Sequence, residues 1–166
     1  IVTLSSELSG SYNSALLASR MYEDENPGKR CHVFNSRSAS VGETLIGLQI
    51  RELENMQASF EEVVVGVEAY IEQQHTYFVL DNLETLRKNG RLSRIKAFVA
   101  TALKIKPIMG STPEGTICQL DQARGMNKAL NRLLAYIDQG KFDTNRKVVI
   151  TQCDSRERCL NIKKVM

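Results

Sequence analysis

A segment rich in hydroxyl groups follows a short apolar run at residues 1–4, and it contains Ser5, Ser6, Ser9, Gly10 and Ser11. The apolar run is typical of a strand, and the residues after the segment have helical spacing, so the segment lies where a strand turns into a helix. The unpaired N–H groups at such a helix start attract a carboxylate or a phosphate. Ser5, Ser6, Ser9 and Gly10 are therefore candidate anion ligands. In the plainer interpretation, Ser9 only caps the helix and the rest is polar loop.

A second polar turn of the same kind spans residues 35–42, again between a strand-like run and a helix. We select two hydroxyl residues of this turn, Ser36 and Ser40, as a possible second wall of the binding crevice. Two adjacent parallel strands that both end in such loops build the two sides of one crevice. The alternative is that Ser40 is an ordinary cap of the next helix.

A third feature is a basic run from Arg87 to Pro113 that holds seven cations and no acid. Such a run can face a phosphorylated ligand, an acidic partner protein, an anionic membrane or nucleic acid, or it can be a solvated face. Phe98 is the single aromatic residue in the run, so base stacking has little support and nucleic acid is the weakest of these partners. The residues selected as a partner or membrane surface are Arg87, Lys88, Arg94 and Lys96.

Signatures of metal and nucleophilic chemistry are missing from the sequence. The four cysteines have wide spacings without a C-x-x-C pair, and the two histidines match no metal-ligand pattern. Phosphate-loop, dinucleotide-binding, G-x-S-x-G and H-E-x-x-H motifs are absent too. We therefore expect no metal site, no resident cofactor and no serine nucleophile at Ser5 or Ser6. The free cysteines are typical of a cytoplasmic protein.

Length and composition fit a globular protein with its own core. The 166 residues carry a net charge of +3, and 42% of them are hydrophobic and 25% charged. This composition argues against intrinsic disorder and against a DNA-coating protein. No apolar run approaches the roughly 20 residues that span a bilayer, so we expect no transmembrane helix.

The first part of the chain predicts a parallel α/β arrangement. Strands at residues 1–4 and 31–35 flank a helix that runs from about Ser9 to residues 25–28, which is a βαβ unit. Helices follow over residues 41–56 and from Ser59, where Ser59 and Glu62 match a capping box. Residues 76–80 form a third strand in this interpretation.

The second part predicts an α+β arrangement with an antiparallel hairpin. Asp81 or Asn82 caps a short helix that stops at residues 89–90, and Ser93 caps a helix over residues 94–103. Residues 107–109 and 116–120 form a hairpin around a Pro- and Gly-containing turn. A helix over residues 126–137, a strand over 147–151 and a final helix from 156 complete the order of elements.

These patterns place a parallel α/β domain at residues 1–80 and an α+β domain at 81–166, with a soft boundary. The chain opens inside a strand without a methionine, and residues 156–166 resemble an unfinished amphipathic helix. We therefore expect the sequence to be a piece of a longer protein.

Five motifs in register resemble the DegV family of bacterial proteins. They are Ser5-Ser6-x-Leu8-Ser9-Gly10-Ser11-Tyr12, Asn35-Ser36 with Ser40-x-Gly42, the run from Asp81 to Ser93, the run from Leu103 to Ile108, and Ala123-Arg124 before a helix. The resemblance implies a two-domain fold, truncated here, that encloses one long-chain fatty acid. It further implies a binding subunit without catalysis of its own, which presents the acid to a separate fatty acid kinase for phospholipid synthesis.

The resemblance also assigns roles to individual residues. Ser5 and Ser6 hold the carboxylate with Ser9 and Gly10 nearby, although the choice between the two serines stays open. Arg91 lies near the head group or on the surface that faces the kinase, and the basic run docks the kinase or transiently contacts an anionic membrane. The rival hypothesis from the residues alone is an enzyme that binds a small anion or a phosphorylated metabolite through the same serine-rich loops.

Overall fold

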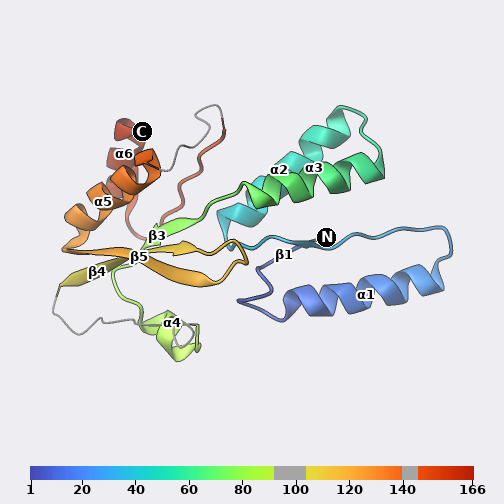
Figure 1. The fold of residues 1–166 in the computed structure, drawn as a ribbon, viewed down its shortest axis with the longest axis horizontal. Helices are drawn as coiled ribbons and strands as arrows, with labels where there is room; N and C mark the ends of the chain where they lie inside the picture. The colour runs from blue at the N-terminus through green and yellow to red at the C-terminus, as the bar shows by residue number, and fades with distance from the viewer. Residues whose placement is uncertain (92–103, 140–145) are drawn as a thin grey trace. The chain divides into compact units, whose positions relative to one another are not determined.

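The computed structural model describes residues 1–91, 104–139 and 146–166. The chain divides into two compact units, and Figure 1 follows its elements from β1 in blue to α6 in red. Unit 1 comprises Ile1–Thr76 and Ser111–Thr116, and unit 2 comprises Tyr77–Gly110 and Ile117–Met166. Within the described ranges, no helix is both long and apolar enough to cross a membrane.

The βαβ arrangement expected at the start of the chain is confirmed. Strand β1 (Val2–Thr3) pairs in parallel with β2 (Phe34–Asn35), and helix α1 (Ser11–Glu25) connects them. The register sets Val2 opposite Phe34 and Thr3 opposite Asn35. The Thr3 hydroxyl donates to the Phe34 carbonyl at 3.2 Å, which adds a side-chain bond to this short ladder.

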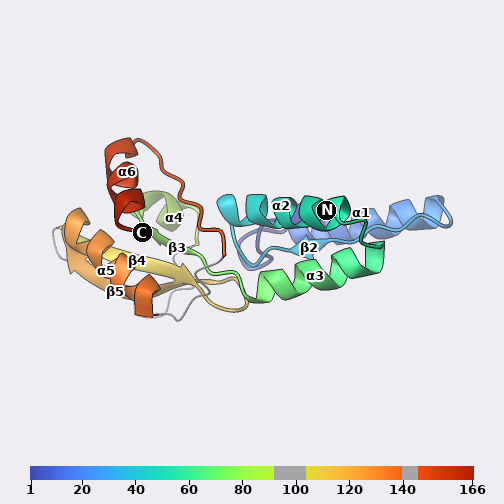
Figure 2. The ribbon, with the colours of Figure 1, turned by 90° about the horizontal axis from the view of Figure 1, so that it is seen from above.

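Two antiparallel helices complete unit 1, and they lie side by side in both views (Figures 1 and 2). Helix α2 spans Val41–Asn55 and α3 spans Phe60–Glu72. Their apolar stripes meet β2 in a core whose buried members are Phe34, Ile46, Val67 and Ile71. Burial of these side chains stabilises the end of the sheet from which the serine-rich loops leave.

The capping box expected at the start of α3 is confirmed. The Ser59 hydroxyl accepts from the Glu62 N–H at 3.3 Å, and the Glu62 carboxylate accepts from the Ser59 N–H at 2.7 Å. Each residue therefore satisfies a backbone N–H that has no partner within the helix.

Unit 2 contains a three-stranded sheet in the order β3, β4, β5. Strands β4 (Ile105–Ser111) and β5 (Ile117–Arg124) form the expected hairpin, closed by a bond of 2.8 Å from the Thr112 N–H to the Thr116 carbonyl. Strand β3 (Tyr77–Val79) pairs antiparallel with β4, whereas the sequence grouped residues 76–80 with the parallel strands. A three-residue apolar run carries no signal of its partner's direction, which explains the difference.

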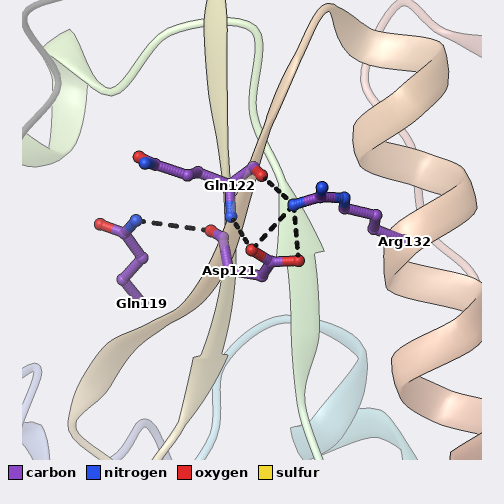
Figure 3. A network of polar contacts seen from close by, with 4 residues as sticks. All are labelled: Gln119, Asp121, Gln122 and Arg132. Carbon is purple, nitrogen blue, oxygen red and sulfur yellow. Dashed lines mark hydrogen bonds and ion pairs between the residues drawn. The ribbon is translucent and has the colours of Figure 1, made fainter.

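Helix α5 (Met126–Gln139) packs on this sheet through the buried side chains of Ile108, Ala123 and Ala129. Arg132 links the helix to β5, as Figure 3 shows. Its Nη1 donates to both Asp121 carboxylate oxygens at 3.1 Å and to the Gln122 carbonyl at 2.7 Å. The Asp121 carboxylate also accepts from the Gln122 N–H at 2.7 Å. Because the Arg132 and Asp121 side chains are exposed to water, their ion pair contributes little to the stability of the fold.

The helices at the two ends of unit 2 confirm the sequence pattern. Helix α4 (Glu84–Lys88) has Leu83 at its N-cap position, so neither Asp81 nor Asn82 is the cap, although the Asn82 side-chain oxygen accepts from the Glu84 N–H at 3.2 Å. It stops before Gly90, which has the positive φ of +70° that a helix end of this type requires. Helix α6 spans Arg156–Val165.

One expected strand is wrong and one expected helix lies outside the described residues. Residues 147–151 form no strand, and Val148 and Val149 are exposed. An apolar run becomes a strand only where another strand pairs with it, and no strand in the described ranges pairs with this one. The helix expected over residues 94–103 falls in the range 92–103, which the structure does not describe.

The capping box gives a first prediction. Ser59→Ala is expected to lower the free energy of unfolding of unit 1 by about 1 kcal/mol, because a helix N–H loses its partner. Ser155 is the matched control, since it precedes α6 but its hydroxyl makes no capping bond. We expect Ser155→Ala to change the free energy of unfolding of unit 2 by less than about 0.5 kcal/mol. Urea denaturation measures both, and equal effects would contradict the assignment.

The same box predicts a pH effect. The Ser59 N–H and then its hydroxyl lower the pKa of Glu62 below its ordinary value of 4.5. A lowered pKa stabilises the fold above the unfolded-state pKa, and this contribution is lost as the pH falls through the folded-state pKa. NMR titration of the Glu62 carboxyl group is expected to show a rise of the pKa in Ser59→Ala that stops short of 4.5, because the backbone N–H remains. An unchanged pKa would contradict the prediction.

Candidate functional site

The two serine-rich loops lie together in unit 1 because β1 and β2 are parallel and end at the same edge. The Ser5 N–H donates to the Ser38 carbonyl at 2.9 Å, and the Ser36 N–H donates to the Thr3 carbonyl at 3.3 Å. These bonds continue the ladder beyond the strands and join the loop after β1 to the loop after β2. The structure thus brings Ser5 and Ser6 next to Ser36.

Asn35 holds Ser6 from the opposite loop. Its side-chain oxygen accepts from the Ser6 N–H at 3.1 Å and from the Arg37 N–H at 3.2 Å, and its amide nitrogen donates to the Ser6 hydroxyl oxygen at 2.8 Å. The two backbone donors fix which end of the amide is oxygen. The Ser6 hydroxyl is therefore an acceptor towards Asn35, and its hydrogen has no acceptor among the described residues.

Ser5 is fully buried and its hydroxyl is engaged in both directions. It donates to the Gly115 carbonyl at 2.9 Å and accepts from the Glu7 N–H at 3.2 Å. The Ser5 carbonyl also accepts from the N–H groups of Leu8 and Ser9 at 2.9 and 3.1 Å. Ser5 is therefore the centre of the loop and has no hydrogen left for a ligand in this arrangement.

Ser9 and Gly10 lead into α1. Gly10 occupies the N-cap position and is exposed, so Ser9 is not the cap that the plainer interpretation made it. The Ser9 hydroxyl instead accepts from the Ser11 N–H at 3.2 Å. The Ser11 hydroxyl oxygen is buried, and no partner for it lies in the described part of the chain. The loop that carries Ser5 and Ser6 thus leads into the N-terminus of a 15-residue helix.

The second loop is fixed mainly by its own bonds. The buried Ser36 hydroxyl donates to the Ser38 carbonyl and accepts from the Ser38 N–H, both at 3.1 Å. The Ser38 hydroxyl lies 2.6 Å from the Thr76 hydroxyl. Ser40 is exposed, has a positive φ of 59° and makes no side-chain capping bond at the start of α2. Ser36 therefore shapes the loop, while Ser40 lies at its outer end.

The selected basic residues belong to unit 2. Arg87 donates to both carboxylate oxygens of Glu84 at 2.8 and 2.6 Å, and Lys88 lies 3.8 Å from the same carboxylate. These contacts lower the pKa of Glu84, chiefly through the Arg87 hydrogen bonds. Arg91 is exposed and donates to the Asn89 carbonyl at 2.6 Å. Arg94 and Lys96 lie outside the described residues.

Two residues that hold the serine-rich loop are not among the candidates from the sequence. Asn35 stood in a quoted motif, but only the structure shows that it holds Ser6. Gly115 was expected only to form a turn, and nothing in the sequence relates it to Ser5, which lies 110 positions away. A polar residue at the end of a strand was the available signal for Asn35, whereas Gly115 offered none.

The Ser6 hydroxyl hydrogen and the start of α1 are suited to a ligand with oxygen acceptors, such as a carboxylate or a phosphate. Over the described ranges, no group of three or more His, Cys, Asp and Glu side chains is placed to hold a metal ion. The geometry thus fits recognition of an anion.

Comparison with curated proteins identifies relatives of the same kind. A DegV domain-containing protein of Streptococcus pyogenes serotype M3 is 35% identical over 162 residues, which are 98% of this chain and 58% of the relative. A protein of the same description from Streptococcus pneumoniae is 33% identical over 159 residues. The chain thus spans little more than half the length of the curated relatives it matches.

Solved structures resemble the chain over nearly its whole length. A DegV family protein from Ruminococcus gnavus, described with vaccenic acid, is 56% identical with a TM-score of 0.92 and covers 99% of this chain and 59% of its own. The Streptococcus pneumoniae Fatty Acid Kinase (Fak) B3 protein, loaded with linoleic acid, is 31% identical with a TM-score of 0.89, over 99% of this chain and 58% of its own.

The family assignment rests on the whole sequence. A family model described as "Uncharacterised protein, DegV family" matches residues 1–166. This range includes both units and all five motifs that carried the resemblance. The chain belongs to the DegV family.

Proposed function

We propose that the protein binds a long-chain fatty acid and that the Ser6 hydroxyl donates a hydrogen bond to its carboxylate. The observation that carries the proposal is the state of Ser6, whose oxygen accepts from Asn35 while its hydrogen is free among the described residues. A carboxylate accepts hydrogen bonds and donates none, so it needs such a donor. The related proteins described with vaccenic and linoleic acid support an acyl ligand.

Ser6 suits this role better than Ser5. A carboxylate would have to displace the Gly115 carbonyl before Ser5 could donate to it, and the buried carbonyl would then lose its partner. Ser6 can donate without breaking any bond described here. Its backbone and its hydroxyl oxygen are both held by Asn35, so the donor is oriented before the ligand arrives.

We further propose that the protein presents the carboxyl group to a separate fatty acid kinase and has no catalysis of its own. The name of the Streptococcus pneumoniae relative, Fatty Acid Kinase (Fak) B3, supports this partner. The kinase would dock on the basic residues Arg87, Lys88, Arg91, Arg94 and Lys96. The protein would act in the cytoplasm without a resident cofactor.

Ser6→Ala tests the carboxylate contact. A hydrogen bond to a charged group contributes about 1.5–3 kcal/mol, so the variant is expected to bind palmitate roughly 10- to 100-fold more weakly. Ser40→Ala is the matched control, because Ser40 is exposed and makes no side-chain capping bond. The measurement is calorimetric titration of the natural polypeptide that carries this sequence, stripped of lipid.

Native mass spectrometry of the same protein from a bacterial host provides an independent reading. We expect a co-purified acid of C16–C18 mass in the wild type and its depletion in Ser6→Ala. Unchanged palmitate affinity in Ser6→Ala would contradict the role of this serine. A lipid-free wild type that binds a phosphate ester through Ser6 would instead favour an enzyme for a small phosphorylated substrate.

A further inference from the structure

The turn between β4 and β5 belongs to unit 1 and contacts the loop that carries Ser5 and Ser6. The Gly115 N–H donates to the Thr112 carbonyl at 2.9 Å, and the Thr116 N–H donates to the Thr112 hydroxyl at 3.2 Å. With its geometry fixed in this way, the turn directs the buried Gly115 carbonyl at the Ser5 hydroxyl, 2.9 Å away.

Gly115 fits this place because it has no side chain. A Cβ atom at this position would lie 2.3 Å from the Ser5 hydroxyl oxygen and 2.7 Å from the Arg37 Cα, closer than packed atoms can approach. Its φ of +91° is also strained for any other residue. Gly28 and Gly125 have nearly the same φ, +86° and +85°, but a Cβ there would meet nothing within 4 Å.

The two residues that a Cβ atom at Gly115 would meet are both linked to Ser6. Ser5 precedes Ser6 in the chain and binds the Glu7, Leu8 and Ser9 N–H groups, so it sets the path of the loop. The Arg37 N–H shares the Asn35 side-chain oxygen with the Ser6 N–H. A shift of the turn would therefore move Ser6 in two ways, through Ser5 and through the Asn35 side chain that Arg37 shares with it.

The charges of the turn favour the same contact. Glu114, next to Gly115, has a pKa lowered chiefly by a hydrogen bond from the Thr112 hydroxyl and also by the positive charge of Arg37. Glu114 and Arg37 therefore attract each other, only weakly because Glu114 is exposed.

We propose that Gly115 is a positioning residue for carboxylate recognition, a role that rests on the proposed function. Its carbonyl takes the Ser5 hydrogen and holds the loop so that Ser6 is the donor to the ligand. A residue far from the serine motif in the chain thereby sets the preference for an acid over a neutral lipid of the same length.

Gly115→Ala in the natural polypeptide tests this role, with affinities measured for palmitate and for hexadecanol. Loss of a charge-assisted hydrogen bond is expected to lower the affinity for palmitate about tenfold or more. The affinity for hexadecanol should fall less than about threefold. The matched control is Gly125→Ala, which introduces the same backbone strain without the close contact and should leave the ratio of the two affinities unchanged.

Ser5→Ala removes the bond to Gly115 without adding a clash, so it decides the question if Gly115→Ala does not fold. It should lower the preference for palmitate in the same direction, and the double variant should lose no more than the larger single effect. Equal losses for acid and alcohol, an unchanged ratio in Gly115→Ala, or additive effects would each overturn the proposal. If the wild type binds neither lipid, the proposed function is overturned, and this inference with it. If the wild type binds palmitate, the variants test the role of Gly115 alone.

Discussion

The parallel pairing of β1 with β2 is the constraint on which the site depends. Parallel strands end at the same edge, so the loops that follow them must leave side by side. The bonds from Ser5 to Ser38 and from Ser36 to Thr3 extend that pairing into the loops. The core formed by α2, α3 and Phe34 packs against β2 and stabilises the pair of strands. Two strands of only two residues each can therefore position the loop that carries Ser5 and Ser6.

Two adjacent serines have different roles because their hydroxyl groups differ in donating and accepting hydrogen bonds. A hydroxyl group has one hydrogen, and where that hydrogen goes decides what the group can still bind. Ser5 gives its hydrogen to Gly115 and organises the loop, whereas Ser6 accepts from Asn35 and keeps its hydrogen. In our proposal, the structural serine and the ligand-binding serine are thus neighbours that differ only in their partners.

Local patterns in the sequence predicted the local structure well, because helices and caps depend on residues a few positions apart. The helices of unit 1, the Ser59 capping box and the β4–β5 hairpin are confirmed. Local patterns do not predict which distant segments pair. Strand β3 lies in an antiparallel sheet, and residues 147–151 have no partner strand in the described ranges. For the same reason the serine loops could be selected, but the contact between Ser5 and Gly115 could not.

The central claim is that Ser6, held by Asn35, donates to the carboxylate of a fatty acid. A crystal structure of the natural polypeptide with bound palmitate tests it most directly. We predict a carboxylate oxygen about 2.5–2.8 Å from the Ser6 hydroxyl oxygen, as expected for a charge-assisted bond, with the Ser5 hydroxyl still on the Gly115 carbonyl. A carboxylate bound to Ser5, with the Gly115 carbonyl displaced, would contradict the account.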